Sequence, residues 1–420
     1  MIIKGDIIYT TEKGSFKQIP SGYIGTADGR VTFAGAEIPE AFRNESVTDY
    51  SGRLVMPGFC DLHTHAPQYE NIGRGMDLTL LPWLETLTFP TESRYGERDY
   101  AEKRYRRAVA DVIRQGTTRA VFFATTHLNS TQMLIDMMEE AGLCGLAGKV
   151  NMDQNCPGYL VEDTDVSLAE TRAFAEKNKD NVHVKPIVSP RFAPSCTPRL
   201  LKGLGELAAE YDLPIQSHIN ENMDEINWVA ELFPEAQNYA DVYRQNGLLN
   251  SQTLMAHCIH MKPEETRMFV ENGVMAVHCP HSNANIASGM MPVKAMMAAG
   301  MRVGLGTDFS GGNAVSILKT MVLALQVSKL RYQMHPEEGF LKLSEAFFLG
   351  TKGGGSFFGK VGSFEEGYAF DALVVDDSAL NREGGNDLED RLSRFIYAGD
   401  DRNIVQRYID GKPVAVPDWD

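Results

Sequence analysis

Two histidines, His63 and His65, are separated by one residue at the end of the apolar run LVMPGFCDL (54–62), and Asp61 stands just before them. Residues i and i+2 of a strand point to the same side, so a strand here would present both imidazoles together. Burying two imidazoles side by side is costly unless a partner satisfies their lone pairs. A divalent metal ion does so, and the spacing therefore predicts a metal site, although a lone histidine is more often a core or surface residue.

Further polar residues stand at the ends of other apolar runs: His218 with Glu221 three residues on, His257, and Asp308. A third imidazole from His218 and a carboxylate from Asp308 would complete a mixed nitrogen and oxygen site, which Zn²⁺ and Fe²⁺ both accept. Glu221, on a loop after its strand, can move protons, and His257 and Asp308 can accept a hydrogen bond from a bound water. The set predicts a metal-dependent hydrolase.

The elements that position these residues are eight short apolar runs separated by amphipathic, helix-like segments. The runs cover residues 54–62, 118–123, 145–150, 182–188, 213–219, 253–258, 274–279 and 302–308. Apolar strands that alternate with helices indicate a parallel sheet covered on both faces. Eight of them predict an α/β fold, a closed (β/α)8 TIM barrel over residues 56–364. Its active site would lie at the carboxyl ends of the strands, where the polar residues converge.

The two ends of the chain differ from this central part. Residues 1–55 and 365–420 are rich in short β-like pieces joined by Gly and Asp turns, such as YIGTADGRVTFAG and IVQRYIDGKPV. Because chain termini often lie close together, these segments are expected to pair into a small β-sandwich domain.

Composition narrows the class of protein. The 420 residues are 43% hydrophobic and 23% charged, as in an ordinary soluble globular protein, and the formal net charge of −16 disfavours nucleic acid and anionic membranes as partners. No run approaches the roughly 18 apolar residues of a membrane span, and the N-terminus is apolar too briefly for a signal peptide. Six scattered cysteines without a CxxC pair indicate reduced thiols. A cytoplasmic location is expected.

The motifs PGFCDLHTH, SHINE, MAHC and GLGTD resemble those of the amidohydrolase superfamily over nearly the whole chain. Within it, more specific stretches are similar to the guanine deaminase family. They lie at residues 65–95, 149–159, 185–196, 216–226, 278–289, 304–312 and 397–404, and include KVNMDQNCPGY, KPIVSPRFAPSC and HCPHSNANIASG.

This resemblance implies the hydrolysis of guanine to xanthine and ammonia. It implies that His63, His65, His218 and Asp308 bind one zinc ion per chain, with Fe²⁺ as the alternative. His257 would hold the metal-bound water, and Glu221 would shuttle protons. A homodimer is also expected from the resemblance.

The resemblance places Gln68, Arg191 and Phe192 at the purine, beside His218 and Glu221. The planar fork of Arg191 suits the O6 and N7 acceptors of guanine, although this arginine could instead pair with an acid. Phe192, Trp83 or Phe89 could stack on the ring. One departure is the motif CPHSN, where CPNSN is expected, so that His281 replaces an asparagine at the mouth.

Two other functions stay open from the sequence. One is an aminohydrolase for another heterocycle, such as 8-oxoguanine, cytosine or a triazine, and the other is a catalytically silent barrel used as a scaffold. Lys149, near the end of the third run, also leaves open a two-metal site bridged by a carbamylated lysine. The intact polar set argues against a scaffold, and the residues expected at the purine argue for guanine.

Overall fold

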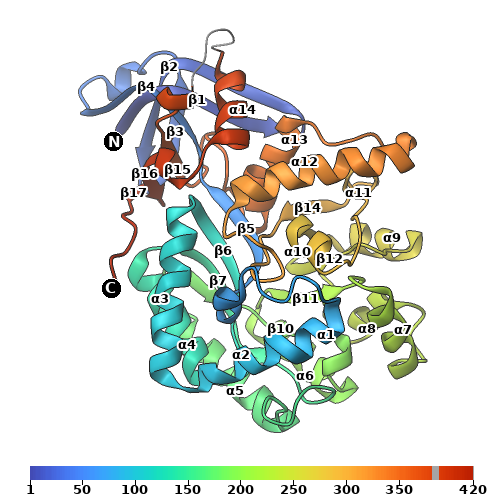
Figure 1. The fold of residues 1–420 in the computed structure, drawn as a ribbon. Helices are drawn as coiled ribbons and strands as arrows, with labels where there is room; N and C mark the ends of the chain where they lie inside the picture. The colour runs from blue at the N-terminus through green and yellow to red at the C-terminus, as the bar shows by residue number, and fades with distance from the viewer. Residues whose placement is uncertain (381–386, 420) are drawn as a thin grey trace.

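The computed structural model describes residues 1–380 and 387–419, and its centre consists of parallel strands (Figure 1). One four-stranded sheet runs in chain order through β5 (Phe59–His65), β6 (Thr117–Phe123), β7 (Cys144–Gly148) and β9 (Val184–Pro186). A second contains β11 (Ile215–Ile219), β12 (Thr253–His257), β13 (Met275–His278) and β14 (Arg302–Leu305). A short pair consists of β8 (Val150–Asn151), which follows β7, and β10 (Ser189–Pro190), which follows β9. Every predicted run contributes to a strand of this central set.

The two parallel sheets touch at both edges. Val188 forms a parallel bridge with Ile215, and the backbone N–H of Asp308 donates to the carbonyl of His63 at 2.9 Å. Strands β5 and β14 also contact each other. The chain therefore has the mixed α/β architecture predicted from its alternating pattern.

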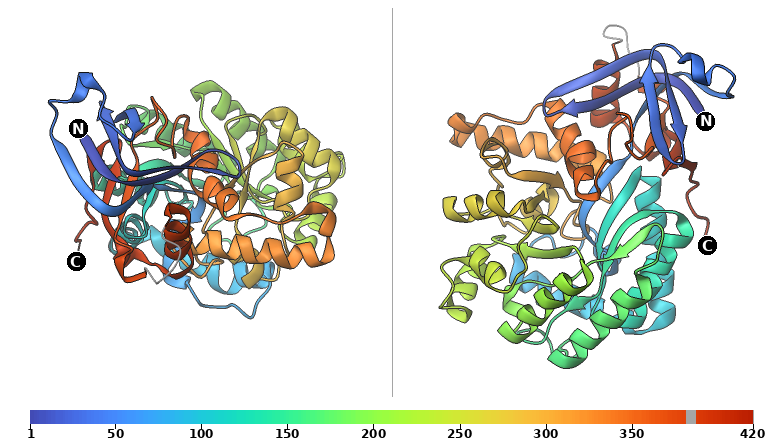
Figure 2. Two further views of the ribbon diagram at one scale, coloured as in Figure 1. Left: turned by 90° about the horizontal axis from the view of Figure 1, so that it is seen from above. Right: turned by 180° about the vertical axis from the view of Figure 1, so that it is seen from behind.

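Helices cover the outside of these strands, as Figures 1 and 2 show. The longer ones are α3 (Arg98–Arg114), α4 (Leu128–Ala141), α5 (Thr164–Asn178), α6 (Pro198–Tyr211), α7 (Met223–Leu232), α9 (Pro263–Asn272), α12 (Ile317–Met334) and α14 (Leu388–Ala398). The shorter ones are α1 (Leu80–Trp83), α2 (Phe89–Ser93), α8 (Tyr239–Gln245), α10 (Pro280–Asn285), α11 (Val293–Ala298) and α13 (Leu343–Phe348). Among the described residues, none combines the length and apolarity required to cross a membrane.

Local sequence explains where these helices start and stop. In α3 the buried residues Tyr105, Ala108, Val109 and Val112 recur at helical spacing and form one apolar face. Helix α4 ends at Gly142, whose left-handed φ of 70° a side chain would disfavour. Helix α5 is capped by Asp163, whose carboxylate accepts from two backbone N–H groups.

The two chain ends form one seven-stranded sheet, in the order β17-β16-β15-β4-β1-β2-β3. Its strands are β1 (Ile2–Glu12), β2 (Ser15–Ala27), β3 (Arg30–Gly35), β4 (Val47–Pro57), β15 (Ala372–Val375), β16 (Ile404–Ile409) and β17 (Lys412–Pro413). A sandwich needs two facing sheets, so the predicted β-sandwich is not seen in the described residues. The sheet lies at the end of the molecule opposite α1 and α2 (Figure 1).

A buried ion pair joins this sheet to the parallel strands. Arg119 of β6 donates to Asp371 at 2.6 and 3.1 Å and to Asp410 at 2.5 Å. The side chain of Asp371 is fully buried, and that of Arg119 is 11% exposed. Removing one member of such a pair leaves a buried charge without a partner.

Replacing Arg119 by Ala is expected to lower the free energy of unfolding by about 3–5 kcal/mol, because the Asp371 carboxylate would stay buried and unpaired. Urea denaturation of the variant measures the loss. Arg199→Ala is the matched control: its pair with Asp165 is 67% and 68% exposed, and such pairs contribute below about 1 kcal/mol. Equal losses in the two variants would show that Arg119 does not join the two parts.

Candidate active site

Strands β5, β11, β12 and β14 bring the predicted polar residues to one place. His63 and His65 lie at the C-terminal end of β5, and their Nε2 atoms are 3.5 and 3.7 Å from the Asp308 carboxylate. The Nε2 atom of His218, from β11, is 3.1 Å from that of His65. All four side chains are nearly or fully buried. The structure thus collects three imidazoles and one carboxylate from strands that are far apart in sequence.

The chemistry of this donor set fits a divalent metal ion. Burial lowers the pKa of His63, His65 and His218, so the three imidazoles are neutral and hold free lone pairs. The Nε2 atom of His63 is buried and has no hydrogen-bond partner. Ligand atoms of His63, His218 and His257 all lie within 4.8 Å of one another. A cation among these nitrogens would satisfy groups that the protein alone leaves unpaired.

Cys279 offers a further ligand atom near His63 and Asp308. Burial raises the pKa of this thiol well above its ordinary value, so it stays protonated and is a poor ligand. Burial alone would raise the pKa of Asp308, but its contacts with the imidazoles of His63 and His257 and with Ser282 outweigh burial and hold this pKa below the ordinary value. Asp308 is therefore the anionic member of the cluster.

Neighbouring groups fix the direction of two imidazoles. The Nδ1–H of His218 donates to the backbone carbonyl of Arg191 at 2.6 Å, and the Nδ1–H of His257 donates to Oδ1 of Asn283 at 2.9 Å. In both rings the lone pair is then on Nε2, which faces the cluster. Sequence reasoning missed Asn283, although it belongs to the HCPHSNANIASG stretch.

Asp61 holds the turn that carries Asp308. Its carboxylate accepts from the backbone N–H of Thr307 at 3.0 Å and from the Thr307 hydroxyl at 2.5 Å. Burial raises the pKa of Asp61 to about 6, while the Thr307 hydrogen bonds act in the opposite direction. This carboxylate therefore connects β5 to the residues after β14 and fixes the position of the segment that carries Asp308.

Some of the strained backbone lies at the same strand ends. His257, Asp308 and Asn220 have φ values of 72°, 42° and 51°, in the left-handed region that residues with a side chain rarely adopt. Such conformations cost about 1–3 kcal/mol each and cluster at functional sites. Two of these residues are predicted catalytic groups, and the third precedes Glu221.

Glu221 faces the cluster from the loop after β11. One of its oxygens is 3.3 Å from Nε2 of His257, and the other accepts from the Ser288 hydroxyl at 3.2 Å. Burial raises its pKa to about 8, and the negative charge of Asp308 adds to the rise. A carboxyl group with such a pKa can both give and take a proton near neutral pH.

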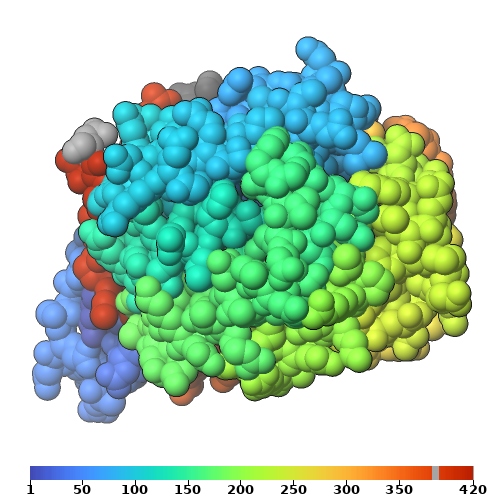
Figure 3. Space-filling model, turned by 90° about the horizontal axis from the view of Figure 1, so that it is seen from below, coloured from blue at the N-terminus to red at the C-terminus, as the bar shows by residue number. Residues whose placement is uncertain are grey.

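A narrow cavity opens onto these groups. It is lined by His65, Gln68, Leu80, Trp83, Leu84, Arg191, Phe192, His218, Glu221, His257, Ser282, Ile286 and Asp308. His63 does not line it. Trp83 does, whereas Phe89 does not: its ring lies 5.5 Å from the guanidinium carbon of Arg191. On the face seen from below, the light-blue segment with α1 and α2 meets the green segments that follow residue 150 (Figure 3).

Arg191 combines the two roles that the sequence left open. It is ion-paired with Glu92, a residue that sequence reasoning did not single out, and it also lines the cavity. Gln68 donates to the same carboxylate at 2.8 Å. Two predicted substrate contacts are therefore held by one acid.

Two further predictions concern residues near the site. Nδ1 of His281 contacts Oδ1 of Asn313 at 2.7 Å, and His281 does not line the cavity, so the departure from CPNSN changes a local hydrogen bond. The amine of Lys149 is ion-paired with Glu162 and lies 3.6 Å from Glu170. Its charge is thereby neutralised away from the histidines, which argues against a carbamate bridge.

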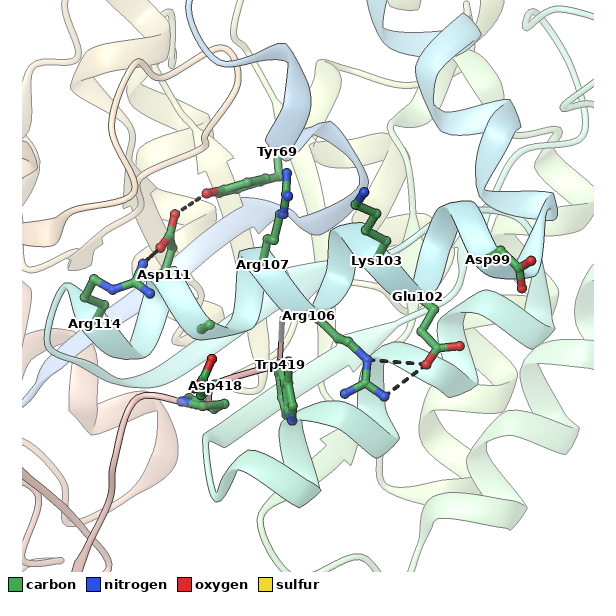
Figure 4. A pocket seen from close by; sticks show the side chains of 12 residues that line it. Tyr69, Asp99, Glu102, Lys103, Arg106, Arg107, Asp111, Arg114, Asp418 and Trp419 are labelled. Atoms are coloured by element: carbon green, nitrogen blue, oxygen red, sulfur yellow. Dashed lines mark hydrogen bonds and ion pairs between the residues drawn. The ribbon is translucent and has the colours of Figure 1, made fainter.

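A wider, more open cavity lies along α3 and the C-terminal segment (Figure 4). Several of its polar side chains pair with one another: Arg106 donates to Glu102 at 3.0 Å, and Tyr69 and Arg114 both bond to Asp111. None of the predicted site residues lines it. All the predicted site residues except His63 line the narrow cavity instead.

Comparison with known proteins agrees with this geometry. Residues 54–414 match the family described as "Amidohydrolase family", so the chain belongs to the amidohydrolases. It is 40% identical over 438 residues to guanine deaminase of Homo sapiens, covering 99% of this chain and 96% of that one. It is 37% identical to guanine deaminase of Dictyostelium discoideum, covering 98% of each chain.

A solved structure gives the same result. The crystal structure of guanine deaminase from C. acetobutylicum with bound guanine in the active site superposes with a TM-score of 0.97 at 47% identity, and covers 99% of both chains. Among the amidohydrolases, this chain groups with the guanine deaminases.

The Asp308→Ala variant is expected to lose its bound metal, because the cluster would keep only neutral imidazoles and no anionic ligand. Elemental analysis of the purified protein measures the metal per chain. His281→Ala is the control, since it removes a buried imidazole at the same mouth that does not line the cavity. A full complement of metal in Asp308→Ala would remove this carboxylate from the ligand set.

Proposed function

We propose that this chain hydrolyses guanine to xanthine and ammonia in the narrow cavity. One observation carries the proposal: the same enclosed space is lined by the polar pair Gln68 and Arg191 and by the proton-transfer candidate Glu221. The similarity to guanine deaminases along the whole chain supports guanine over 8-oxoguanine, cytosine or a triazine.

The metal in this proposal is one zinc ion per chain, with Fe²⁺ as the alternative. His63, His65, His218 and Asp308 would hold it, because their ligand atoms converge and three of them are neutral imidazoles. When bound, such an ion makes water nucleophilic at neutral pH.

Proton transfer is assigned to Glu221. In the reaction, the oxygen of water bonds to C2 of guanine, the bond between C2 and its amine breaks, and ammonia leaves. Glu221 takes a proton from the water, protonates the ring at N3, and passes a further proton to the departing amine. Asp308 and His257 accept hydrogen bonds from the attacking water and aim it at C2; the Nε2 of His257 faces both carboxylates.

Recognition of the base is assigned to Gln68 and Arg191, which form the recognition wall of the cavity, together with neighbouring lining residues. Arg191 donates from its planar fork to O6 and N7, Gln68 contacts a neighbouring position, and His218 lines the same cavity. Phe192 and Trp83, which are 5% and 4% exposed and line the cavity, pack against the faces of the ring. The apolar side chains of Leu80 and Leu84 help to exclude water.

The architecture implied by the family completes the proposal. The two parallel sheets would act as one closed (β/α)8 barrel over residues 56–364, with residues 1–55 and 365–420 as a second domain; the Val188–Ile215 bridge supports closure. A cytoplasmic homodimer is also proposed. Exposed Leu330 and Met334, one turn apart on α12, are apolar side chains that self-association would cover, and sedimentation in solution tests this.

The proposal is tested by ammonia release from guanine, 8-oxoguanine, cytosine, adenine and melamine, with metal content measured on the same protein. Ammonia from guanine, with about one metal per chain, is the expected result. Turnover of another compound only would mean that Gln68 and Arg191 read a different base. A protein with neither metal nor turnover would favour the scaffold.

Glu221→Gln is expected to keep its metal and bind guanine but to lose turnover by roughly 10²–10⁴-fold, because the amide cannot carry protons. Metal analysis, equilibrium binding of guanine and the rate of ammonia release measure the three properties. The control is Glu162→Gln, a partly buried acid that does not line the cavity. Near-normal turnover in Glu221→Gln would exclude Glu221 as the proton carrier.

A further inference from the structure

Glu92 is a buried acid that touches both polar residues of the recognition wall. It lies in α2 and is 1% exposed. One carboxylate oxygen accepts from the side-chain amide of Gln68 at 2.8 Å, and the other is ion-paired with Nη1 of Arg191. Glu92 itself does not line the cavity, so it acts behind the two residues that do.

The contact with Glu92 decides which end of the Gln68 amide meets the cavity. A carboxylate paired with a guanidinium only accepts hydrogen bonds, so Gln68 must turn its NH₂ group toward it. The amide oxygen of Gln68 is then directed away from Glu92. This Oε1 atom is buried and has no hydrogen-bond partner, and Gln68 lines the cavity. The wall therefore offers an unpaired acceptor to whatever binds there.

The same contact limits Arg191. One of its N–H groups is held by Glu92, and the ring of Phe89 lies 5.5 Å from its guanidinium carbon. The remaining N–H groups are donors in a fixed plane. The wall then presents donors from Arg191 next to an acceptor from Gln68.

We propose that Glu92 is the positioning residue that sets base specificity, by fixing Gln68 as an acceptor and Arg191 as a donor. This inference rests on the proposed function. Guanine carries two acceptors, O6 and N7, beside the N1–H donor, and this order complements the wall. In a purine without O6, N1 carries no hydrogen and is an acceptor. Its lone pair would face the lone pairs of the Gln68 Oε1 atom. Leaving such a group unsatisfied is costly, so Glu92 works partly by exclusion.

The test compares two substrates that share the reacting amine. 2-Aminopurine keeps the amine at C2 but lacks O6 and N1–H. In Glu92→Gln, the new side-chain amide has only one acceptor oxygen. When this oxygen accepts from Arg191, the NH₂ group of the new amide faces Gln68 and favours a flipped Gln68 amide. We expect kcat/KM for guanine to fall by roughly 10- to 100-fold, mainly through KM, as for the loss of a buried hydrogen bond. The value for 2-aminopurine should change far less, so the ratio of the two collapses.

Three controls separate positioning from a general defect. Glu162→Gln removes a carboxylate that is paired with the buried Lys149 but lies outside this cavity, and the substrate ratio should not change. In a Gln68→Ala background, Glu92→Gln should have a smaller effect on the ratio, because the two changes act on one contact. Gln68→Met removes the acceptor while leaving the Glu92–Arg191 pair, and should lower the ratio even if Glu92→Gln does not fold.

The outcomes are distinct. A collapse of the ratio in Glu92→Gln and Gln68→Met, with a normal ratio in Glu162→Gln, supports the assignment. Equal losses for both substrates, or an unchanged ratio in Gln68→Met, would overturn it and leave Glu92 a structural residue. Where turnover of 2-aminopurine is below detection, its inhibition constant replaces kcat/KM. Failure of the wild-type protein to deaminate guanine would instead overturn the proposed function, and this is measured first.

Discussion

Burial of three neutral imidazoles against one carboxylate is the constraint on which the rest of this structure depends. Their ring nitrogens converge within a few ångströms and away from water, and the Nε2 atom of His63 has no hydrogen-bond partner, so a cation would stabilise the arrangement. The surroundings are organised to maintain it. A backbone carbonyl fixes the ring of His218, Asn283 fixes that of His257, and Asp61 holds the turn before Asp308.

A buried ion pair lies on the side of the cavity for which substrate recognition is proposed. Arg191 is a buried cation, and Glu92 neutralises it within the protein so that its other donors stay available. Arg191 also connects the two halves of the site, since its carbonyl accepts from His218 while its guanidinium faces the cavity. One residue therefore contacts both the cavity and an imidazole of the histidine cluster.

The sequence predicted the parts of the site that follow from strand geometry. His63, His65, His218, His257 and Asp308 stand at the ends of apolar runs, and parallel strands bring their carboxyl ends to one edge. Gln68, Arg191 and Phe192 came from the resemblance, and all three line the cavity. Glu92, Asn283 and Thr307 were missed because their roles depend on contacts with residues far away in the chain, which no local pattern records. Strand register and the number of sheets also depend on contacts between distant parts of the chain. The terminal strands were therefore predicted, but their arrangement in one sheet was not.

Strained backbone and a buried ion pair lie at opposite ends of the parallel strands. The positive φ values of His257 and Asp308 lie at the carboxyl ends of the strands, next to the cavity. At the other end, the buried pair of Arg119 with Asp371 joins the parallel strands to the terminal sheet, and continuous apolar clusters fill the space between. Strained residues persist only where the surrounding structure holds them in place. The terminal sheet contributes no side chain to the cavity, and its contact with the parallel strands through Arg119 is structural.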